Sequence, residues 1–350
     1  MEHLGRSAGV LLSLWLTLPA CSSDEGASGG SGGTVSGGGP SSGGDSAGSG
    51  GAGGADSCPV LGDSLPPGFT ELVPQPNTFT PLSVIGAAEG QLYYVDPWNK
   101  VMRVPIAGGA PTELGTVKGA PNLRSPDLLL WWEWEGEGIG AKLVSAPLSD
   151  LSTTKVVVSG SSVTEIEADA THAYYGTRNP ANLYRVALSG EAPAEMLVPD
   201  GVTLGAVLNG GFLYWTDEVT SRLERVPRAG GPREKLSEVF LGGPMVGDDD
   251  AVYWGDHMKG LEKWSERTGR VSLAEGDPER LALSDGVLYW LDQHDRFRGG
   301  FASVRSIKVD GTDPRWLLCG FGQLPPGEIV VEGPYVIFSV DGHGIVRLER

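Results

Sequence analysis

The chain has 350 residues, with 44 acidic against 26 basic side chains, and its formal net charge at pH 7 is −18. This excess of acids excludes the charge pattern of a nucleic-acid binder and of a protein held on an anionic membrane surface by basic patches. We therefore expect no nucleic-acid partner. The chain is long enough for one large domain or two small ones.

The first twenty residues have the form of an export signal. Arg6 lies in a short polar start, and residues 8–18 form an apolar run shorter than the about 20 residues that a membrane-spanning helix needs. The run ends in Leu18-Pro19-Ala20-Cys21, which resembles the lipobox of bacterial lipoproteins. This resemblance implies a lipoprotein signal peptide over residues 1–20 and acylation of Cys21. The alternative is an ordinary secretory signal with a coincidental Cys.

A region rich in Gly and Ser follows the signal. Residues 22–57 contain 15 Gly and 10 Ser without a periodic apolar face, so burial cannot offset the entropy lost on ordering. We expect residues 21–57 to be an acylated Cys followed by a disordered tether. Ser22 stands where the best-known sorting rule requires Asp for retention at the inner membrane. We therefore expect an outer-membrane lipoprotein of the cell envelope, facing the periplasm or the cell surface.

Two cysteines remain after Cys21. Cys58 and Cys319 form an even pair in a chain expected to be exported, where disulfides persist. We expect them to form a disulfide. The chain has no Cys-x-x-Cys, so a thiolate metal site is not indicated.

A pair of neighbouring large apolar residues recurs through residues 58–350. The second member of each pair stands at 94, 132, 175, 215, 254, 290 and 338, with spacings between 36 and 48 residues. Such spacings are close to the roughly 40–45 residues of a propeller blade. Each unit reads as short strands separated by turns with Gly or Asp, and no segment has the pattern of a helix of ten residues.

Two adjacent large apolar residues in one strand point to opposite faces of its sheet, so both faces must be buried. Stacked blades provide this burial. The last unit lacks a fourth strand, which residues 68–73 can supply. We predict an all-β fold over residues 58–350, a seven-bladed β-propeller of four-stranded antiparallel blades closed by an N-terminal strand. Six blades are the alternative.

The segment Tyr214-Trp215-Thr216-Asp217 resembles the repeats of low-density-lipoprotein-receptor-type propellers and of related bacterial propellers of the six-bladed superfamily. Residues 253–256 and 289–292 are near matches. The resemblance implies a propeller and, by analogy, a binding platform. This chain departs from the receptors because it has seven units and lacks their cysteine-rich modules.

Loops after the second strand of each unit are expected on one face, around the central channel. The candidate residues of this binding face are Trp98, Trp134, Arg178, Asp217, Asp256, His257, Asp292, His294, Asp341 and His343. Charged or polar residues at equivalent places in the first strands are candidates for the channel mouth: Asn122, Glu165, Arg280 and Glu328. The alternative for the first set is strand capping by Asp and solvated loops, and for the second a polar, water-filled channel.

Two charged stretches have simpler interpretations. The acids of residues 248–250 lie where other units have a turn, so turn chemistry explains them. Arg222, Arg225, Arg228, Arg233 and Lys235 are interpreted as a solvated sheet edge.

Two functions are compatible with these patterns. The first is non-catalytic: a membrane-anchored propeller that binds a protein, peptide or glycan on its loop face, with no catalytic residues and no cofactor. The alternative is a metal-dependent hydrolase or lyase at the channel mouth, in which Glu165, Glu328 and His294 would act and a divalent cation would be bound. An enzyme needs several of these groups at one point, whereas a binder needs an exposed apolar or aromatic patch.

Overall fold

The computed structural model describes thirteen stretches of the chain: 58–62, 64–76, 81–119, 121–125, 127–135, 140–160, 163–178, 180–201, 203–217, 219–239, 242–293, 302–321 and 327–350. The chain divides into the units Met1–Gly53 and Gly54–Arg350, and every described residue belongs to the second. The predicted signal, Cys21 and the tether lie outside the described residues, as does His294.

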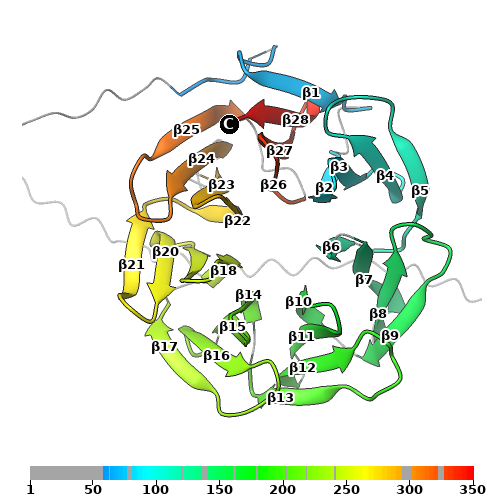
Figure 1. The fold of residues 1–350 in the computed structure, drawn as a ribbon, viewed down its shortest axis with the longest axis vertical. Coiled ribbons are helices and arrows are strands. Elements are labelled where there is room, and N and C mark those ends of the chain that lie inside the picture. The colour runs from blue at the N-terminus through cyan, green and yellow to red at the C-terminus, as the bar shows by residue number, and fades with distance from the viewer. Residues whose placement is uncertain are drawn as a thin grey trace, which may run out of the picture. The chain divides into compact units, whose positions relative to one another are not determined.

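Seven four-stranded antiparallel sheets are arranged around a central axis (Figure 1). Blades 1 to 3 contain β2 (Ser83–Ala88), β3 (Gln91–Val95), β4 (Lys100–Pro105) and β5 (Thr112–Thr116); β6 (Asn122–Ser125), β7 (Leu128–Glu135), β8 (Gly140–Pro147) and β9 (Lys155–Gly160); β10 (Val163–Ala168), β11 (His172–Arg178), β12 (Ala181–Ala187) and β13 (Glu195–Pro199). In each blade the first strand is innermost and the fourth is outermost.

The remaining blades repeat this order. Blades 4 to 6 contain β14 (Thr203–Asn209), β15 (Phe212–Asp217), β16 (Arg222–Pro227) and β17 (Glu234–Glu238); β18 (Gly242–Gly247), β19 (Val252–Asp256), β20 (Gly260–Ser265) and β21 (Gly269–Ala274); β22 (Pro278–Ser284), β23 (Val287–Gln293), β24 (Ala302–Lys308) and β25 (Arg315–Phe321). Blade 7 contains β26 (Val330–Glu332), β27 (Tyr335–Val340), β28 (Gly344–Glu349) and β1 (Phe69–Val73). The prediction of seven blades is confirmed, and the alternative of six is wrong.

The first and last parts of the propeller close the ring together. The N-terminal strand β1 pairs antiparallel with β28, with Phe69 opposite Leu348 and Val73 opposite Ile345 (Figure 1). On the inner side, Val84 of blade 1 forms a β-bridge with Gly327 before β26. The predicted closure by an N-terminal strand is confirmed, and it gives the outer edge of β28 a partner.

The paired aromatic residues explain why the blades stack. Trp215 is fully buried and packs in a core cluster with Tyr174 and Leu197 of blade 3. Its neighbour Tyr214 points to the other side and packs in a cluster with Trp254 and Trp264 of blade 5. Each blade therefore supplies apolar side chains to both neighbours, as the strand alternation predicts.

Basic side chains of third strands connect consecutive blades. In blades 3, 4, 5 and 7 a cation reaches the turn after the third strand of the next blade. These contacts are Arg185 Nη1 to Arg228 O (2.6 Å), Arg225 Nη1 to Glu266 Oε1 (2.5 Å), Lys263 Nζ to Val309 O (2.9 Å), and Arg347 Nη1 to Ile106 O. All four lie opposite the first residue of the paired positions, Tyr174, Tyr214, Tyr253 and Ile337. The stacking of blades is thus reinforced by polar contacts near the rim.

The interpretation of residues 222–235 as a solvated edge is wrong for Arg225, whereas Arg228 is partly buried and Arg233 is exposed. Arg225 is 13 % exposed and is paired with Glu234 and Glu266. Arg233 is paired with Glu224 inside its own blade, and Arg228 makes an ion pair with Asp169 of blade 3. Lys235 does lie on the surface, where it pairs with Glu238. Two of the acidic partners of these arginines lie nine residues away across the β16–β17 hairpin, and the other two come from neighbouring blades, so the alternation within one strand did not indicate them.

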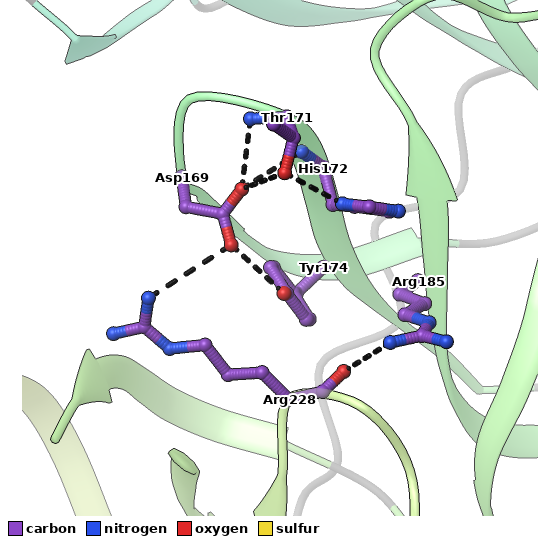
Figure 2. A network of polar contacts seen from close by, with 6 residues as sticks. All are labelled: Asp169, Thr171, His172, Tyr174, Arg185 and Arg228. Carbon is purple, nitrogen blue, oxygen red and sulfur yellow. Dashed lines mark hydrogen bonds and ion pairs between the residues drawn. The ribbon is translucent and has the colours of Figure 1, made fainter. Parts of the chain in front are cut away.

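Figure 2 shows how a turn between first and second strands is fixed. Asp169 Oδ1 accepts hydrogen bonds from the backbone N of Thr171 (2.8 Å) and of His172 (2.9 Å). Its Oδ2 accepts one from the hydroxyl of Tyr174 (2.9 Å) and lies 3.8 Å from Nη1 of Arg228. Burial works against the charged form, but these hydrogen bonds outweigh it, and the pKa of Asp169 is lowered.

The same arrangement recurs two blades further on. Asp248 Oδ1 accepts hydrogen bonds from the backbone N of Asp250 (3.0 Å) and of Ala251 (2.9 Å), and Oδ2 accepts one from Tyr253 (2.9 Å). Turn chemistry therefore accounts for the acidic run at 248–250, as expected from the sequence.

A disulfide joins Cys58 to Cys319, the pair expected from the cysteine count, with Cα atoms 5.9 Å apart. Backbone hydrogen bonds support it, from Cys319 N to Pro59 O (2.8 Å) and from Leu61 N to Cys319 O (3.0 Å). The first described residues are thereby held against the outermost strand of blade 6. Within the described stretches, no helix combines the length and the apolar character that spanning a membrane requires.

Candidate functional site

One face of the propeller collects the connections from second to third strands and those from each blade to the next. All blades have the same strand order, so both kinds of connection emerge on the same side. We call this side the loop face; it contains residues 96–99, 219–221, 256–259, 275–277 and 341–343 among those described. Loops on a rigid scaffold are the usual place for binding and catalytic residues.

Aspartates at the ends of second strands shape the loop face. Asp217 Oδ1 accepts hydrogen bonds from the backbone N of Val219 (3.1 Å) and of Thr220 (2.7 Å). Asp96 and Asp256 each accept a hydrogen bond from the backbone N two positions further along the chain. The donors are Trp98 N (2.9 Å) and Met258 N (3.1 Å). The capping alternative is therefore what the structure shows for Asp217 and Asp256.

The caps leave three apolar side chains in solvent. Trp98, Val219 and Met258 each donate their backbone N–H to the capping Asp, and their side chains are 62 %, 74 % and 61 % exposed. We call these residues the apolar triplet. They occupy equivalent positions in blades 1, 4 and 5, so the loop face displays apolar groups at several places. Trp98 was a candidate from the sequence; Val219 and Met258 were missed, although the shared Asp-x-apolar pattern could have indicated them.

The other aspartates and histidines of this face differ from one another. Asp292 is buried, accepts a hydrogen bond from the backbone N of Asp277 (2.7 Å) and pairs with Arg305 (2.8 Å). Asp341 is exposed. His343 Nε2 lies 3.2 Å from the carbonyl oxygen of Gly62 in the N-terminal segment.

The remaining predicted face residues are placed only in part. Arg178 is exposed at the end of β11. Trp134 lies in β7, but its side chain is not among those described, and His294 lies outside the described residues.

The predicted channel residues lie on or beside the innermost strands. Arg280 Nε donates to Gly327 O (3.1 Å) and its Nη1 to Glu279 O (2.6 Å), so its guanidinium connects blades 6 and 7 through backbone carbonyls. The backbone N of Glu328 donates to Val84 O (2.8 Å). Asn122 begins β6, and Glu165 lies in β10 with a side chain that is not among those described.

One histidine of the loop face meets two acids that the sequence analysis missed. His257 Nδ1 is 2.5 Å from Asp277 Oδ1 and 3.8 Å from Glu279 Oε1. Among the described residues, this is the one group in which three side chains of His, Cys, Asp or Glu bring donor atoms within 4.8 Å of one another. The side chains are 20 %, 19 % and 14 % exposed in the same order. A signal was available, because Asp277 and Glu279 flank the start of a first strand next to the predicted Arg280.

A buried tyrosine stands behind the loop face in blade 1. Burial, and then the charge of Asp96, raise the pKa of Tyr94 to about 12. Its phenol therefore stays protonated above the pH at which an unfolded Tyr ionises, and its ring packs in the core.

Comparison with known proteins agrees on the fold. No protein-family model and no curated protein sequence matches this chain. The computationally designed Ika8 protein matches with a TM-score of 0.55 and 10 % identity over 80 % of this chain and 99 % of that one. A puromycin-hydrolyzing peptidase of Mycobacterium tuberculosis matches with a TM-score of 0.54 and 12 % identity over 77 % of this chain and 51 % of that one.

A puromycin hydrolase gives a similar result, with a TM-score of 0.54 and 14 % identity over 81 % of this chain and 54 % of that one. The chain thus spans about half the length of these two hydrolases. At such identities the similarities show a shared β-propeller and nothing about activity.

Proposed function

We propose that this protein is an exported lipoprotein whose propeller acts as an interaction platform, with a protein or peptide bound on the loop face. The apolar triplet is the observation that carries this proposal. Exposed apolar groups cost solvation free energy unless a partner covers them, and aromatic residues are enriched in binding hot spots. A glycan, for which an exposed Trp is also suited, is the alternative ligand class.

The loop face is suited to binding because its display is rigid. Two positions before each residue of the apolar triplet stands an Asp whose carboxylate accepts a hydrogen bond from the loop backbone. Two of these aspartates, Asp217 and Asp256, are buried. Because the loop backbone is already held by these hydrogen bonds, a ligand that binds it has to order few further groups. Less affinity is therefore lost to conformational entropy. The resemblance of residues 214–217 to receptor-type repeats supports the same function.

The membrane anchor is the second part of the proposal. The apolar run at 8–18 and the lipobox-like Leu18-Pro19-Ala20-Cys21 support acylation of Cys21, and residues 22–57 have the composition of a spacer. Several acyl chains on one Cys give stable anchoring, since each buried methylene contributes about 0.8 kcal/mol. The expected location is the outer membrane of the cell envelope.

Site-specific photo-crosslinking tests the platform. A photoreactive amino acid is placed at position 98, 219 or 258 of the full-length chain in its native envelope, and control probes are placed at Val156 and Met196. These control residues are 47 % and 52 % exposed but lie on outermost strands. Discrete adducts from the loop face, and none from the outer strands, are expected. Equal labelling at both places would reject the loop face as the docking surface.

Replacing the acylation site tests the anchor. Cys21→Ala is expected to move the protein from the membrane fraction to the soluble envelope fraction, and metabolic labelling with a fatty acid is expected to disappear. Ser22→Ala is the matched control and should change neither. If the Cys21→Ala protein still sediments with membranes and the parent incorporates no label, the lipoprotein assignment is wrong.

A metal-dependent hydrolase is the second candidate function, now placed on the loop face rather than at the channel mouth, and it is favoured by the approach of His257, Asp277 and Glu279. Two acids and one imidazole suffice as the protein ligands of a catalytic metal ion. Metal-dependent hydrolysis would then require such an ion to be bound by these three residues. The hydrolase similarities do not add to this alternative, because they report the fold alone.

A further inference from the structure

We propose that His257, Asp277 and Glu279 form a binding site for one divalent transition-metal ion, with Zn²⁺ as the best match, where blades 5 and 6 meet on the loop face. The three residues come from two connections and one strand: His257 follows β19, Asp277 lies between β21 and β22, and Glu279 is in β22. Zinc binding here does not require the docking function proposed above, although both lie on the same face.

The donor set fits zinc better than calcium or magnesium. Ca²⁺ and Mg²⁺ take oxygen ligands, whereas an imidazole nitrogen together with carboxylates is a set that Zn²⁺ commonly uses. Tetrahedral zinc places its donor atoms about 3.3–3.5 Å apart. His257 Nδ1 and Glu279 Oε1 are 3.8 Å apart, close to this spacing. His257 Nδ1 and Asp277 Oδ1 are at hydrogen-bond distance, 2.5 Å. Binding of an ion between them would increase this distance by about 1 Å.

Charge balance also favours a cation here. Two carboxylates lie next to one ring nitrogen, and all three side chains are at most 20 % exposed. Like charges that are partly removed from water repel one another unless a positive charge lies between them. A divalent ion between the three side chains would carry enough charge to balance both carboxylates.

Hydrogen bonds outside the site hold the ligands in place. The backbone N of Asp277 donates to Asp292 Oδ1 (2.7 Å), and its carbonyl oxygen accepts from Gln293 N (3.1 Å). Residues 256–258 are fixed by the hydrogen bond from Met258 N to Asp256. Ligands on such supported backbone are better preorganised than ligands on free loops.

Two glycines lie next to the site, one beside the histidine ring and one beside the strand that carries Glu279. A Cβ on Gly243 would lie 3.1 Å from His257 Nε2, and one on Gly255 would lie 2.6 Å from Pro278 O. Gly243 therefore lies beside Nε2, and Nδ1 is the nitrogen that faces the two acids. Larger residues at either position would displace the ring or the strand that carries Glu279.

A metal at this place would have two effects. It would join the loop after β19 to blade 6 directly before Met258, and so fix one member of the apolar triplet. Three protein ligands also leave a coordination position for water or a ligand group, as in zinc sites that bind substrates. The proposal thus links the ion to the surface that displays the exposed side chains.

Zinc titration of the full-length protein tests this site. The protein is purified with a tag that lacks histidine, treated with chelator and titrated with Zn²⁺ against a chromophoric competitor, with elemental analysis for stoichiometry. One tight zinc per chain is expected. Loss of a hydrogen-bond partner of a metal ligand typically weakens metal binding by about 10–100-fold. The Kd for zinc should rise by more than this in each of His257→Gln, Asp277→Asn and Glu279→Gln, because these variants remove a ligand itself.

Two controls make the result decisive. His172→Gln removes a histidine that contacts Thr171 on the opposite face, and it should leave zinc affinity unchanged. Zinc should also raise the Tm of the unaltered protein, because an ion that binds only the folded state stabilises it, while Ca²⁺ and Mg²⁺ should not. Near-ultraviolet circular dichroism identifies any variant that fails to fold. If the parent binds no zinc tightly, or if all three variants bind zinc as the parent does, the proposed zinc site is wrong. The three residues would then form only an ion-pair cluster.

Discussion

Aspartates that end the second strands look equivalent in the sequence, but their surroundings differ. Asp217 is buried, holds the backbone of residues 219 and 220, and lies 3.5 Å from Arg233. Asp341 follows the second strand of blade 7, one position beyond the place that matches Asp217, and is exposed. Burial decides how much each carboxylate contributes, since a buried charge depends on its partners and an exposed one has water.

A buried and an exposed aspartate of the same face can be compared directly. Asp217→Asn keeps the size of the side chain but removes the charge that faces Arg233, and it should lower the free energy of unfolding by about 1–3 kcal/mol. Asp341→Asn should change it by less than about 0.5 kcal/mol. Urea denaturation followed by tryptophan fluorescence measures both. Equal effects of the two substitutions would contradict the structural role given to Asp217.

Buried tyrosines make stability sensitive to high pH. Burial is the main cause that raises the pKa of Tyr94, Tyr174 and Tyr175 to about 12 each, with the charge of Asp96 adding at Tyr94 and the hydrogen bond to Asp169 at Tyr174. An unfolded chain ionises these phenols near pH 10. The folded state therefore holds more protons between about pH 10 and about pH 12, so stability present below pH 10 is lost across this window.

We expect Tm to fall steadily as pH rises from about 10 to about 12. Phenolate absorbance of these residues should appear together with unfolding rather than before it. The variant Tyr94→Phe/Tyr174→Phe/Tyr175→Phe should show a shallower fall, because it lacks the three groups. An unchanged slope in that variant would show that other groups control the alkaline transition.

At the scale of single strands, the inner strands pack unusually closely. A Cβ on Gly205 of β14 would lie 1.8 Å from Gly243 O of β18, and one on Gly242 would lie 2.3 Å from Thr216 Cβ. The seven first strands converge around the axis (Figure 1), and the backbones of β14 and β18 lie close together where blades 4 and 5 meet. Glycine is required there by space rather than by backbone dihedral angles.

Adding one methyl group tests this packing. Gly205→Ala should destabilise the protein by about 3 kcal/mol or more, because the carbonyl of Gly243 cannot move without separating two blades. Gly160→Ala is the control, since a Cβ at Gly160 meets nothing within 4 Å, and it should change stability by less than about 1 kcal/mol. Thermal unfolding measures both variants. A tolerated Gly205→Ala would mean that the inner strands have more room.

For the whole molecule, closure of the ring depends on its two ends. Strand β1 completes the sheet of blade 7, and the Cys58–Cys319 disulfide fixes the preceding residues to blade 6. The bond links residues that are 261 positions apart. A cross-link over so long a loop removes much conformational freedom from the unfolded chain. The first described residues therefore stabilise the propeller in two ways.

Removing the disulfide should weaken the whole propeller. Cys58→Ser/Cys319→Ser is expected to lower the free energy of unfolding by about 2–5 kcal/mol. A reductant should lower the Tm of the parent to that of the variant and leave the variant unchanged. Calorimetry with and without reductant measures this. A variant as stable as the parent would show that pairing of β1 alone suffices for closure.

Most of the fold could be predicted from local pattern. Repeated pairs such as Tyr214-Trp215 require burial on both sides of each strand, and the missing last strand required residues 68–73 to complete blade 7. The candidate site was predicted only in part. His257 was named because of its position after a second strand, whereas Asp277 and Glu279 depend on which loops of blades 5 and 6 meet.

By itself, the sequence determined the propeller fold, the strand order within a blade and the placement of the capping aspartates, because strand alternation and turn chemistry act between residues close in the chain. Tertiary structure alone decided three things. It set which aspartates are buried, it turned Arg225 and Arg228 toward acids of neighbouring blades, and it brought His257 to Asp277 and Glu279. These contacts depend on how one blade is rotated and packed against the next, and no local pattern encodes that geometry.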